Sequence, residues 1–449
     1  GDLPDVFADQ GFRANCVKTA ILAADTMRPD MKAADQVAGL YRGKVFARMG
    51  GLVARAYGGI FSYMANFPAI EAGPGLSFPK DLGTPEYYYP EPDPGVFLKL
   101  TRFKGGTKGP VILANGFGTK ASSFATPTVK ENVVQTLYRG GYDVWLFDYR
   151  GSGDIEASLQ PFDLDDVAQK DWPSAIDLVT DITEQEKVQV LVHCVGSMTL
   201  FMAVLAGEER VRSIISSQLS AHAITNWFKF AQADSRTAGM LANGLPRKLW
   251  GLADMLPLGP ELTQVAKTGL PNVDPRSPSQ TGCSQDFDHA VDGMLWKVPA
   301  FAPVPCYSPT CHRINFIFGP SYRHAQLNQE THTSIAHMFG PVSSTPFLHL
   351  ARIFRTGHPV SADGETNYLD HPERLSMPIH FFAGGRNQEM LPEATLRTLT
   401  WLETSNNRKG AGPYTRKVYP DYGHMDCFIG KTAHLDIFQD LCKVFDQTR

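Results

Sequence analysis

The residue of this chain best suited to covalent chemistry is Cys194, in the segment LVHCVGS at residues 191–197. A β-branched apolar run ends there abruptly, and small residues lead into an apolar helical pattern. This strand–turn–helix context is typical of a nucleophile elbow, whose sharp turn exposes the nucleophile above the sheet. In the usual motif, G-x-S-x-G, serine stands where cysteine is found here, and Val192 occupies the position of the first glycine. Gly196 fits the position where the strand and helix backbones approach too closely for a Cβ atom.

The candidate general base is His424, which follows the last apolar run in the segment PDYGHMDCFIG at residues 420–430. An imidazole titrates near neutrality, so it can take the proton of a thiol and later return one to a leaving group. The alternative interpretation of Cys194 is a buried, inert thiol, because free cysteine is among the most buried residue types. Alkylation by iodoacetamide near pH 7 distinguishes the two, since a buried inert thiol resists it.

Short apolar runs predict the strands that would position these residues, at residues 97–103, 111–114, 142–147, 188–192, 211–215, 378–383 and 416–419. They alternate with helical patterns, which favours an α/β fold with a mostly parallel central sheet and helices on both faces. Residues 221–376 are too many for an ordinary connection between two strands, and they are predicted to form a large helical cap insertion. Residues 1–85 are predicted to be an accessory helical segment, which leaves residues 86–220 and 377–449 as the two parts of the core.

Together these features resemble an alpha/beta hydrolase over roughly residues 86–445. The loop around His424 resembles the G-H-x-D loop of acid-lipase-like members. A closer resemblance is to the hydrolase-like domains found alone or behind glucose-methanol-choline-type (cholesterol-oxidase-like) flavin oxidoreductases. Three segments carry it: HCVGS at residues 193–197, CHRI at 311–314 and GHMDC at 423–427. This resemblance implies an apolar substrate, and the sequence contains no flavin-binding fingerprint.

The resemblance also implies a catalytic triad, with one departure. In this family the nucleophile, the acid and the histidine follow in that order, each on the loop after a strand. Asn387 stands where the acid is expected, in the segment FAGGRNQEMLP at residues 382–392. A Cys-His-Asn triad, as in papain-like enzymes, is chemically reasonable because a thiolate–imidazolium pair needs its third residue only to orient the ring. Glu389, and after it Asp426, are the alternatives for this role.

The oxyanion hole of this fold uses the amide after the nucleophile and an amide after the third strand. In this sequence these amides belong to Val195 and Phe117. Asn115, in the segment NGFG at residues 115–118, is expected to brace the loop that carries Phe117.

The cap is rich in hydrogen-bonding and aromatic side chains between residues 311 and 332. Tyr322, His324 and His332 are predicted to bind the substrate, and a polar core of the cap is the alternative interpretation. The cysteines of this region lack a C-x-x-C pair, so no metal site is predicted. No cofactor is expected either.

Net charge, apolar runs and cysteine content limit which partners and which location the sequence predicts. The net charge of −4 gives no reason to expect nucleic acid, and no apolar run approaches the ~20 residues of a membrane span. The beginning of the sequence lacks the pattern of a signal peptide, and the 7 cysteines form no dense framework. These features favour a cytoplasmic location.

The sequence therefore predicts a hydrolase that acts by acyl transfer through a cysteine thioester on an apolar ester, lactone or thioester. The first alternative is an acyltransferase or cyclase with a non-water acceptor, as in polyhydroxyalkanoate synthases, whose elbow also carries cysteine. The second is a non-catalytic binding protein with the same fold. The expected partner is an apolar acyl molecule, with an oxidoreductase or a second copy of the chain as a protein partner.

Overall fold

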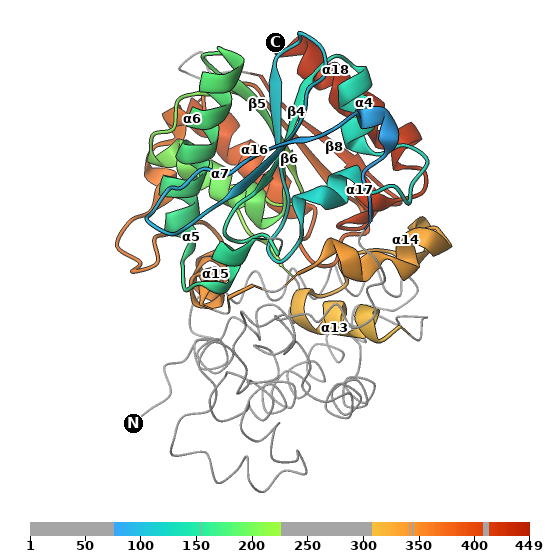
Figure 1. The fold of residues 1–449 in the computed structure, drawn as a ribbon. Coiled ribbons are helices and arrows are strands. Elements are labelled where there is room, and N and C mark those ends of the chain that lie inside the picture. The colour runs from blue at the N-terminus through green and yellow to red at the C-terminus, as the bar shows by residue number, and fades with distance from the viewer. Residues whose placement is uncertain (1–75, 154, 226–307, 341, 344, 407–412) are drawn as a thin grey trace, which may run out of the picture.

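The computed structural model of the chain, shown in Figure 1, describes residues 76–153, 155–225, 308–340, 342–343, 345–406 and 413–449. The predicted accessory segment, up to residue 75, and residues 226–307 of the predicted cap lie outside these ranges.

An eight-stranded sheet forms the centre of the described chain, in the order β1-β2-β4-β3-β5-β6-β7-β8. Pairs β1–β2 and β2–β4 are antiparallel and the other pairs are parallel, so the predicted mostly parallel sheet is confirmed. The strands are β1 (Glu86–Tyr88), β2 (Lys99–Phe103), β3 (Pro110–Ala114), β4 (Asp143–Asp148), β5 (Val188–His193), β6 (Val211–Ser217), β7 (Ile379–Gly384) and β8 (Tyr414–Tyr419). The sequence analysis missed β1, because its three residues are largely exposed and pair only at the edge of the sheet.

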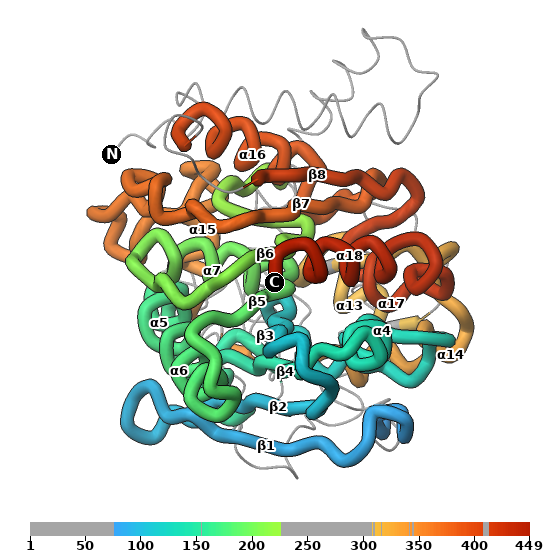
Figure 2. The backbone as a smooth tube through the Cα atoms, turned by 90° about the horizontal axis from the view of Figure 1, so that it is seen from above, coloured from blue at the N-terminus to red at the C-terminus, as the bar shows by residue number. Residues whose placement is uncertain are grey.

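Helices cover both faces of this sheet, as Figure 2 shows from above. The helices of the described residues are α4 (Val133–Arg139), α5 (Leu164–Asp166), α6 (Trp172–Thr183), α7 (Val195–Ala206), α13 (Pro309–Phe318), α14 (Gln329–Thr333), α15 (Pro346–Thr356), α16 (Glu393–Asn406), α17 (Asp426–Ile429) and α18 (Gln439–Gln447). Side chains of β3 alternate between two hydrophobic clusters. Val111 and Leu113 pack with residues of α4, α17 and α18, whereas Ile112 and Ala114 pack with residues of α6, α7 and α16. This alternation is what a sheet buried on both faces requires.

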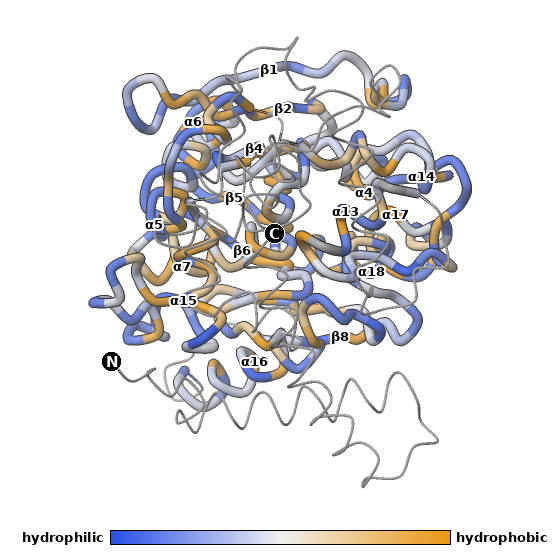
Figure 3. Tube along the Cα trace, turned by 90° about the horizontal axis from the view of Figure 1, so that it is seen from below, coloured by the Kyte–Doolittle hydropathy of each residue, from blue (hydrophilic) through white to orange (hydrophobic). Residues whose placement is uncertain are grey.

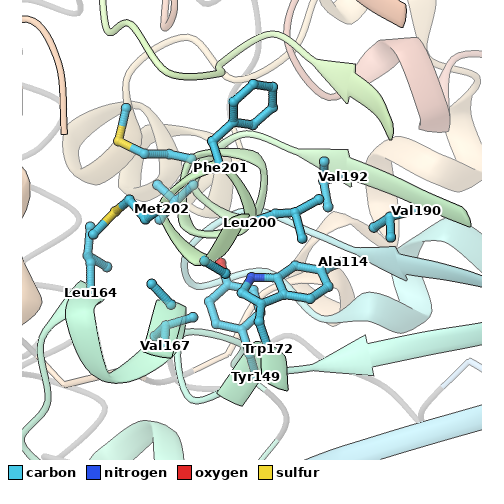
Figure 4. Packing of buried hydrophobic residues seen from close by; sticks show 14 of the residues in the cluster. Ala114, Tyr149, Leu164, Val167, Trp172, Val190, Val192, Leu200, Phe201 and Met202 are labelled. Carbon is cyan, nitrogen blue, oxygen red and sulfur yellow. The ribbon is translucent and has the colours of Figure 1, made fainter. Parts of the chain in front are cut away.

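Helix α7, which follows β5, lies inside the core rather than on its surface. All of its residues from Val195 to Leu205 are buried, so the helix is apolar all round, as buried helices are. Figure 4 shows Leu200, Phe201 and Met202 of α7 packed among side chains of the strands and of α6. The start of α7 is therefore held in place by packing on every side.

Two helices of the predicted cap lie at one edge of the core. Helices α13 and α14 are at the lower edge in Figure 1, near α17. In Figure 3 hydrophobic stretches follow the central strands, whereas α14 is hydrophilic. Within the described part of the chain, no helix has the length and apolar character that crossing a membrane requires.

Candidate active site

Cys194 lies at the turn between β5 and α7, in a backbone conformation that favours glycine. Its φ is 55° and its ψ is −128°, a strain of about 1–3 kcal/mol for a residue with a side chain. The turn is held by three hydrogen bonds: Cys194 N donates to the Ser217 carbonyl (3.1 Å), and its own carbonyl accepts from the N–H groups of Ser197 (3.0 Å) and Met198 (3.2 Å). Val192, at the position of the missing first glycine, is fully buried in the core. The strained turn of a nucleophile elbow is thus present without that glycine.

Two glycines allow the loop after β3 to pack against this turn. A Cβ atom on Gly196 would lie 2.3 Å from the carbonyl oxygen of Asn115. A Cβ atom on Gly116 would lie 2.9 Å from Cβ and 3.3 Å from Sγ of Cys194. Gly196 therefore lies at a close approach of two backbones, but the neighbouring backbone is that of the loop after β3 and not, as predicted, that of the strand before the turn.

The amides of Phe117 and Val195, predicted to form the oxyanion hole, flank Cys194 on these two segments. Neither amide donates a hydrogen bond to any acceptor among the described residues. Asn115 braces the loop as expected, because its Oδ1 accepts from Gly116 N (2.7 Å) and its Nδ2 donates to Ser123 Oγ. Both amides are therefore available to a bound oxygen.

His424 lies on the loop after β8 and comes close to Cys194. A ring nitrogen of His424, Sγ of Cys194 and a carboxylate oxygen of Glu389 all lie within 4.8 Å of one another. All three side chains are buried, with exposed fractions of 2%, 6% and 3%. The structure thus brings together a thiol, an imidazole and a carboxylate from the ends of β5, β7 and β8.

Asn387 contacts His424 at Nδ1, the ring nitrogen that points away from Glu389. Its Oδ1 accepts from the backbone N–H groups of Glu389 (2.9 Å) and Met390 (3.1 Å). Its Nδ2 lies 2.9 Å from Oε1 of Gln218 and 3.0 Å from Nδ1 of His424. Because two backbone donors face the oxygen, the amide cannot be turned around without losing both hydrogen bonds.

The orientation of Gln218, on the loop after β6, is determined in the same way. Its Oε1 accepts from Gly384 N (2.9 Å), and its Nε2 faces the carbonyl oxygens of Gly423 (3.4 Å) and His424 (3.2 Å). Gln218 therefore accepts from Asn387, and Asn387 donates to Nδ1 of His424. A neutral ring that accepts at Nδ1 carries its proton on Nε2, the nitrogen on the side of Glu389. This polarity is the reverse of a triad in which Nδ1–H donates to the third residue.

Glu389 lies at the opposite end of the ring from Asn387. Its Oε1 is 3.8 Å from Nε2 of His424, and its Oε2 accepts from Ser321 Oγ (2.6 Å). Asp426, the other alternative, accepts from the backbone N–H groups of Gly423 (2.8 Å) and Arg323 (3.3 Å). Burial raises the pKa of Asp426 to about 6. The contacts of Asp426 hold the loop that carries His424 closed, whereas Glu389 faces Nε2 of His424.

Sequence reasoning gave no role to His193, which directly precedes the nucleophile. Its ring centroid is 4.4 Å from that of His424, and its Nδ1 lies 3.1 Å from Ser217 Oγ. Burial, and then the neighbouring His424, hold the pKa of His193 well below 6.5. A neutral aromatic ring therefore packs against His424 near pH 7. The position of His193 next to Cys194, in the segment HCVGS, was the sequence signal that could have indicated this contact.

The predicted substrate-binding residues form a separate group. Tyr322 donates its hydroxyl to Sγ of Cys311 (3.0 Å), and His332 Nε2 lies 3.2 Å from the same sulfur. The rings of His324 and His332 are 5.0 Å apart. One residue before Tyr322, Ser321 contacts Glu389, so this group and the site around Cys194 are connected through the backbone.

Comparisons with known proteins find similarity to hydrolases and to a polymerase subunit. A family model described as "alpha/beta hydrolase fold" matches residues 109–245. Human "Lipase member K" is 26% identical over 349 residues, which are 76% of this chain and 80% of that protein. The "Poly(3-hydroxyalkanoate) polymerase subunit PhaC" of Haloferax mediterranei is 30% identical over 83 residues, 18% of this chain and 16% of that protein. Among solved structures, an esterase from Exiguobacterium antarcticum has a TM-score of 0.48 and 14% identity, covering 80% of this chain and 100% of that one.

Proposed function

We propose that this chain, which has the alpha/beta-hydrolase fold, is an acyl hydrolase of the lipase and esterase type that works through a thioester on Cys194. The observation that carries the proposal is the strained turn at Cys194, with a ring nitrogen of His424 and a carboxylate oxygen of Glu389 within 4.8 Å. The amides of Phe117 and Val195, which donate to no acceptor among the described residues, support it, because such donors stabilise a developing oxyanion by ~3 kcal/mol each.

The polarity of Asn387 decides how protons would move. Since Nδ1 of His424 accepts from Asn387, Nε2 of the neutral ring is a donor and has no lone pair for the thiol proton. Glu389 is then the base, and the Cys194 thiol gives its proton to this carboxylate. The Nε2–H group of His424, which points toward Glu389 and Cys194, stabilises the negative charge of the carboxylate before the transfer and of the thiolate after it. In this scheme Cys194, His424 and Asn387 still act as a unit, and Asn387 fixes the tautomer.

The reaction would run in two halves. The thiolate attacks the acyl carbon, the carbonyl oxygen becomes an oxyanion at the two amides, and collapse expels the alcohol or thiol. The leaving group takes the proton held by Glu389, and an acyl thioester remains on Cys194. Water then gives a proton to Glu389 and attacks the thioester, and the Cys194 thiolate leaves and recovers that proton.

The proposed substrate is an ester, lactone or thioester with an apolar acyl group. Aromatic rings lie beside the oxyanion loop: Phe117 packs edge-on against Phe347 at 5.1 Å, and a Cβ atom on Gly118 would lie 2.8 Å from the ring of Phe318. An apolar pocket gains roughly 0.8 kcal/mol for each buried methylene group. The similarity to a protein named a lipase supports the same substrate class.

Intact-protein mass spectrometry tests the proposal directly. The chain is exposed to nitrophenyl esters and acyl thioesters of increasing chain length, and the parent should gain one acyl group that Cys194→Ala does not. In the same series kcat/KM should rise from C2 to C8, whereas a flat or falling series would indicate a small polar site. Absence of any adduct, together with resistance of Cys194 to iodoacetamide, would favour a non-catalytic binding protein.

Acyl transfer to an acceptor other than water is the second candidate. The similarity to a polymerase subunit over 83 residues favours it, and thioesters persist long enough to meet such an acceptor. Product analysis with added alcohols and thiols separates the two functions, because a transferase forms the new ester faster than the free acid. An oxidoreductase or a second copy of the chain stays the predicted protein partner.

A further inference from the structure

Four side chains of the cap region place sulfur, nitrogen and oxygen donors in one small volume. Cys311 lies in the first turn of α13, His324 begins the short helix His324–Gln326, and His332 belongs to α14. One donor atom each of Cys311, His324 and His332 lies within 4.8 Å of the other two. Tyr322 completes the group, with its hydroxyl 3.0 Å from Sγ of Cys311. None of these residues is used by the proposed acyl transfer.

The spacing of these donors is close to that around a tetrahedral zinc ion. Bonds of about 2.3 Å to sulfur and about 2.0–2.1 Å to nitrogen place two ligand atoms about 3.3–3.6 Å apart. For a sulfur–nitrogen pair this separation is about 3.5–3.6 Å. Sγ of Cys311 and Nε2 of His332 are 3.2 Å apart, so the two atoms would move apart slightly to hold the ion between them. A ring nitrogen of His324 lies within 4.8 Å of both atoms, so the third ligand comes from the same small volume.

We propose that Cys311, His324 and His332 bind a zinc ion. A thiolate with two imidazoles is a nitrogen–sulfur set that suits zinc and not calcium or magnesium, which take oxygen ligands. The hydroxyl of Tyr322 donates to the sulfur, the kind of outer contact that orients a metal ligand. A fourth ligand would complete the tetrahedron.

The consequence of metal binding would be to hold the residues beside the active site. The ligands come from three short elements, and Ser321 next to them donates to Glu389. The same region is tied to the core by Thr331, whose Oγ1 lies 2.8 Å from that of Thr128. The ion would therefore hold residues 311–332 in place, and with them Ser321 and the Glu389 carboxylate that Ser321 contacts.

The test measures metal directly on the full chain. Purified protein should contain about one zinc ion per chain by elemental mass spectrometry. After removal by a chelator, titration with cobalt(II) should give a thiolate-to-cobalt charge-transfer band and intense tetrahedral d–d bands. Cys311→Ser and His332→Ala should lose the charge-transfer band or bind cobalt at least tenfold more weakly. Metal should raise the Tm of the parent and have no such effect on these variants.

Matched variants separate this site from the rest of the chain. Cys194→Ser tests the other cysteine and histidine cluster, and Cys442→Ser and His337→Gln are controls outside both clusters. All three should keep the cobalt spectrum of the parent. If Cys311→Ser does not fold, Tyr322→Phe replaces it and should shift the charge-transfer band by removing the hydrogen bond to sulfur. A parent that binds no metal, or a band lost in Cys194→Ser and kept in Cys311→Ser, would overturn the proposal.

Discussion

Replacing Asn387 with aspartate tests the polarity of the hydrogen bonds behind His424. The change keeps Oδ1, which accepts from Glu389 N and Met390 N, and removes both donated hydrogen bonds. A carboxylate oxygen would then face Oε1 of Gln218 at about the 2.9 Å now occupied by a hydrogen bond. Toward His424 it can only accept, so the ring must place its proton on Nδ1. The expected result is a change of tautomer from Nε2–H to Nδ1–H.

The sizes of the expected effects follow from the contacts of residue 387 with Gln218 and with His424. Opposing Gln218 with a second acceptor should cost about 1–3 kcal/mol, and a charge-assisted hydrogen bond to Nδ1–H should return about 1.5–3 kcal/mol. The free energy of unfolding should therefore change little, whereas the tautomer ratio should shift by about tenfold to a hundredfold. With a lone pair on Nε2, His424 becomes a base in its own right. Glu389→Gln should then cost about 10²–10⁴-fold in kcat in the parent and less than about tenfold in Asn387→Asp.

The assay is ¹⁵N NMR of histidine-labelled protein, with the His424 signals assigned by their absence in His424→Gln. In the parent, Nδ1 should resonate as an unprotonated ring nitrogen, and in Asn387→Asp this signature should move to Nε2. Kinetics of the parent, Asn387→Asp, Glu389→Gln and the double variant give the coupling free energy between the two residues. A protonated Nδ1 in the parent, or equal effects of Glu389→Gln in both backgrounds, would refute the assigned polarity and return the role of base to His424.

Cys194→Ser should retain below about 1% of the activity, since a hydroxyl is far harder to deprotonate than a thiol, while Cys442→Ser on α18 should be fully active in the same ester assay. Gly116→Ala should lower kcat more than it raises KM, and should cost about 1–3 kcal/mol in urea unfolding, because its Cβ would lie 2.9 Å from Cβ of Cys194. Burial lowers the pKa of His380 to about 4, so the unfolded chain binds more protons between pH 4 and 6.5 and stability falls as pH falls through that window. The loss should reach about 3 kcal/mol at pH 4, and His380→Asn should remove it from the pH dependence of urea unfolding.

Each of these three predictions can be contradicted by a specific result. Serine as active as cysteine would show that thiolate formation is not needed. A silent Gly116→Ala would mean that the loop after β3 does not press on the nucleophile. An unchanged pH dependence in His380→Asn would assign the acid sensitivity to other buried groups, among them His222, whose pKa burial lowers to about 3.

The core strands were readable from sequence because their signal is local. A run such as residues 111–114 is apolar on both faces, so burial on both sides of a parallel sheet follows from the run itself. The elbow was readable for the same reason, since the residues that make the strand, the turn and the start of α7 are contiguous. Strand β1 was not, because its exposed side chains carry no apolar pattern and only pairing with β2 defines it.

By itself, the sequence determined the chain order of Cys194, Asn387 and His424 and the loops that carry them, because each loop follows a strand with a local apolar signal. Only the tertiary structure decided what each of them donates or accepts. The direction of the Asn387 amide depends on Gln218, 169 residues away, and on backbone groups whose positions exist only in the folded chain. Likewise Glu389 lies beside Cys194 rather than behind His424, and Cys311 meets His332 across 21 residues. Sequence spacing predicts which residues share an edge of the sheet. Hydrogen-bond polarity and donor distances are set by long-range packing.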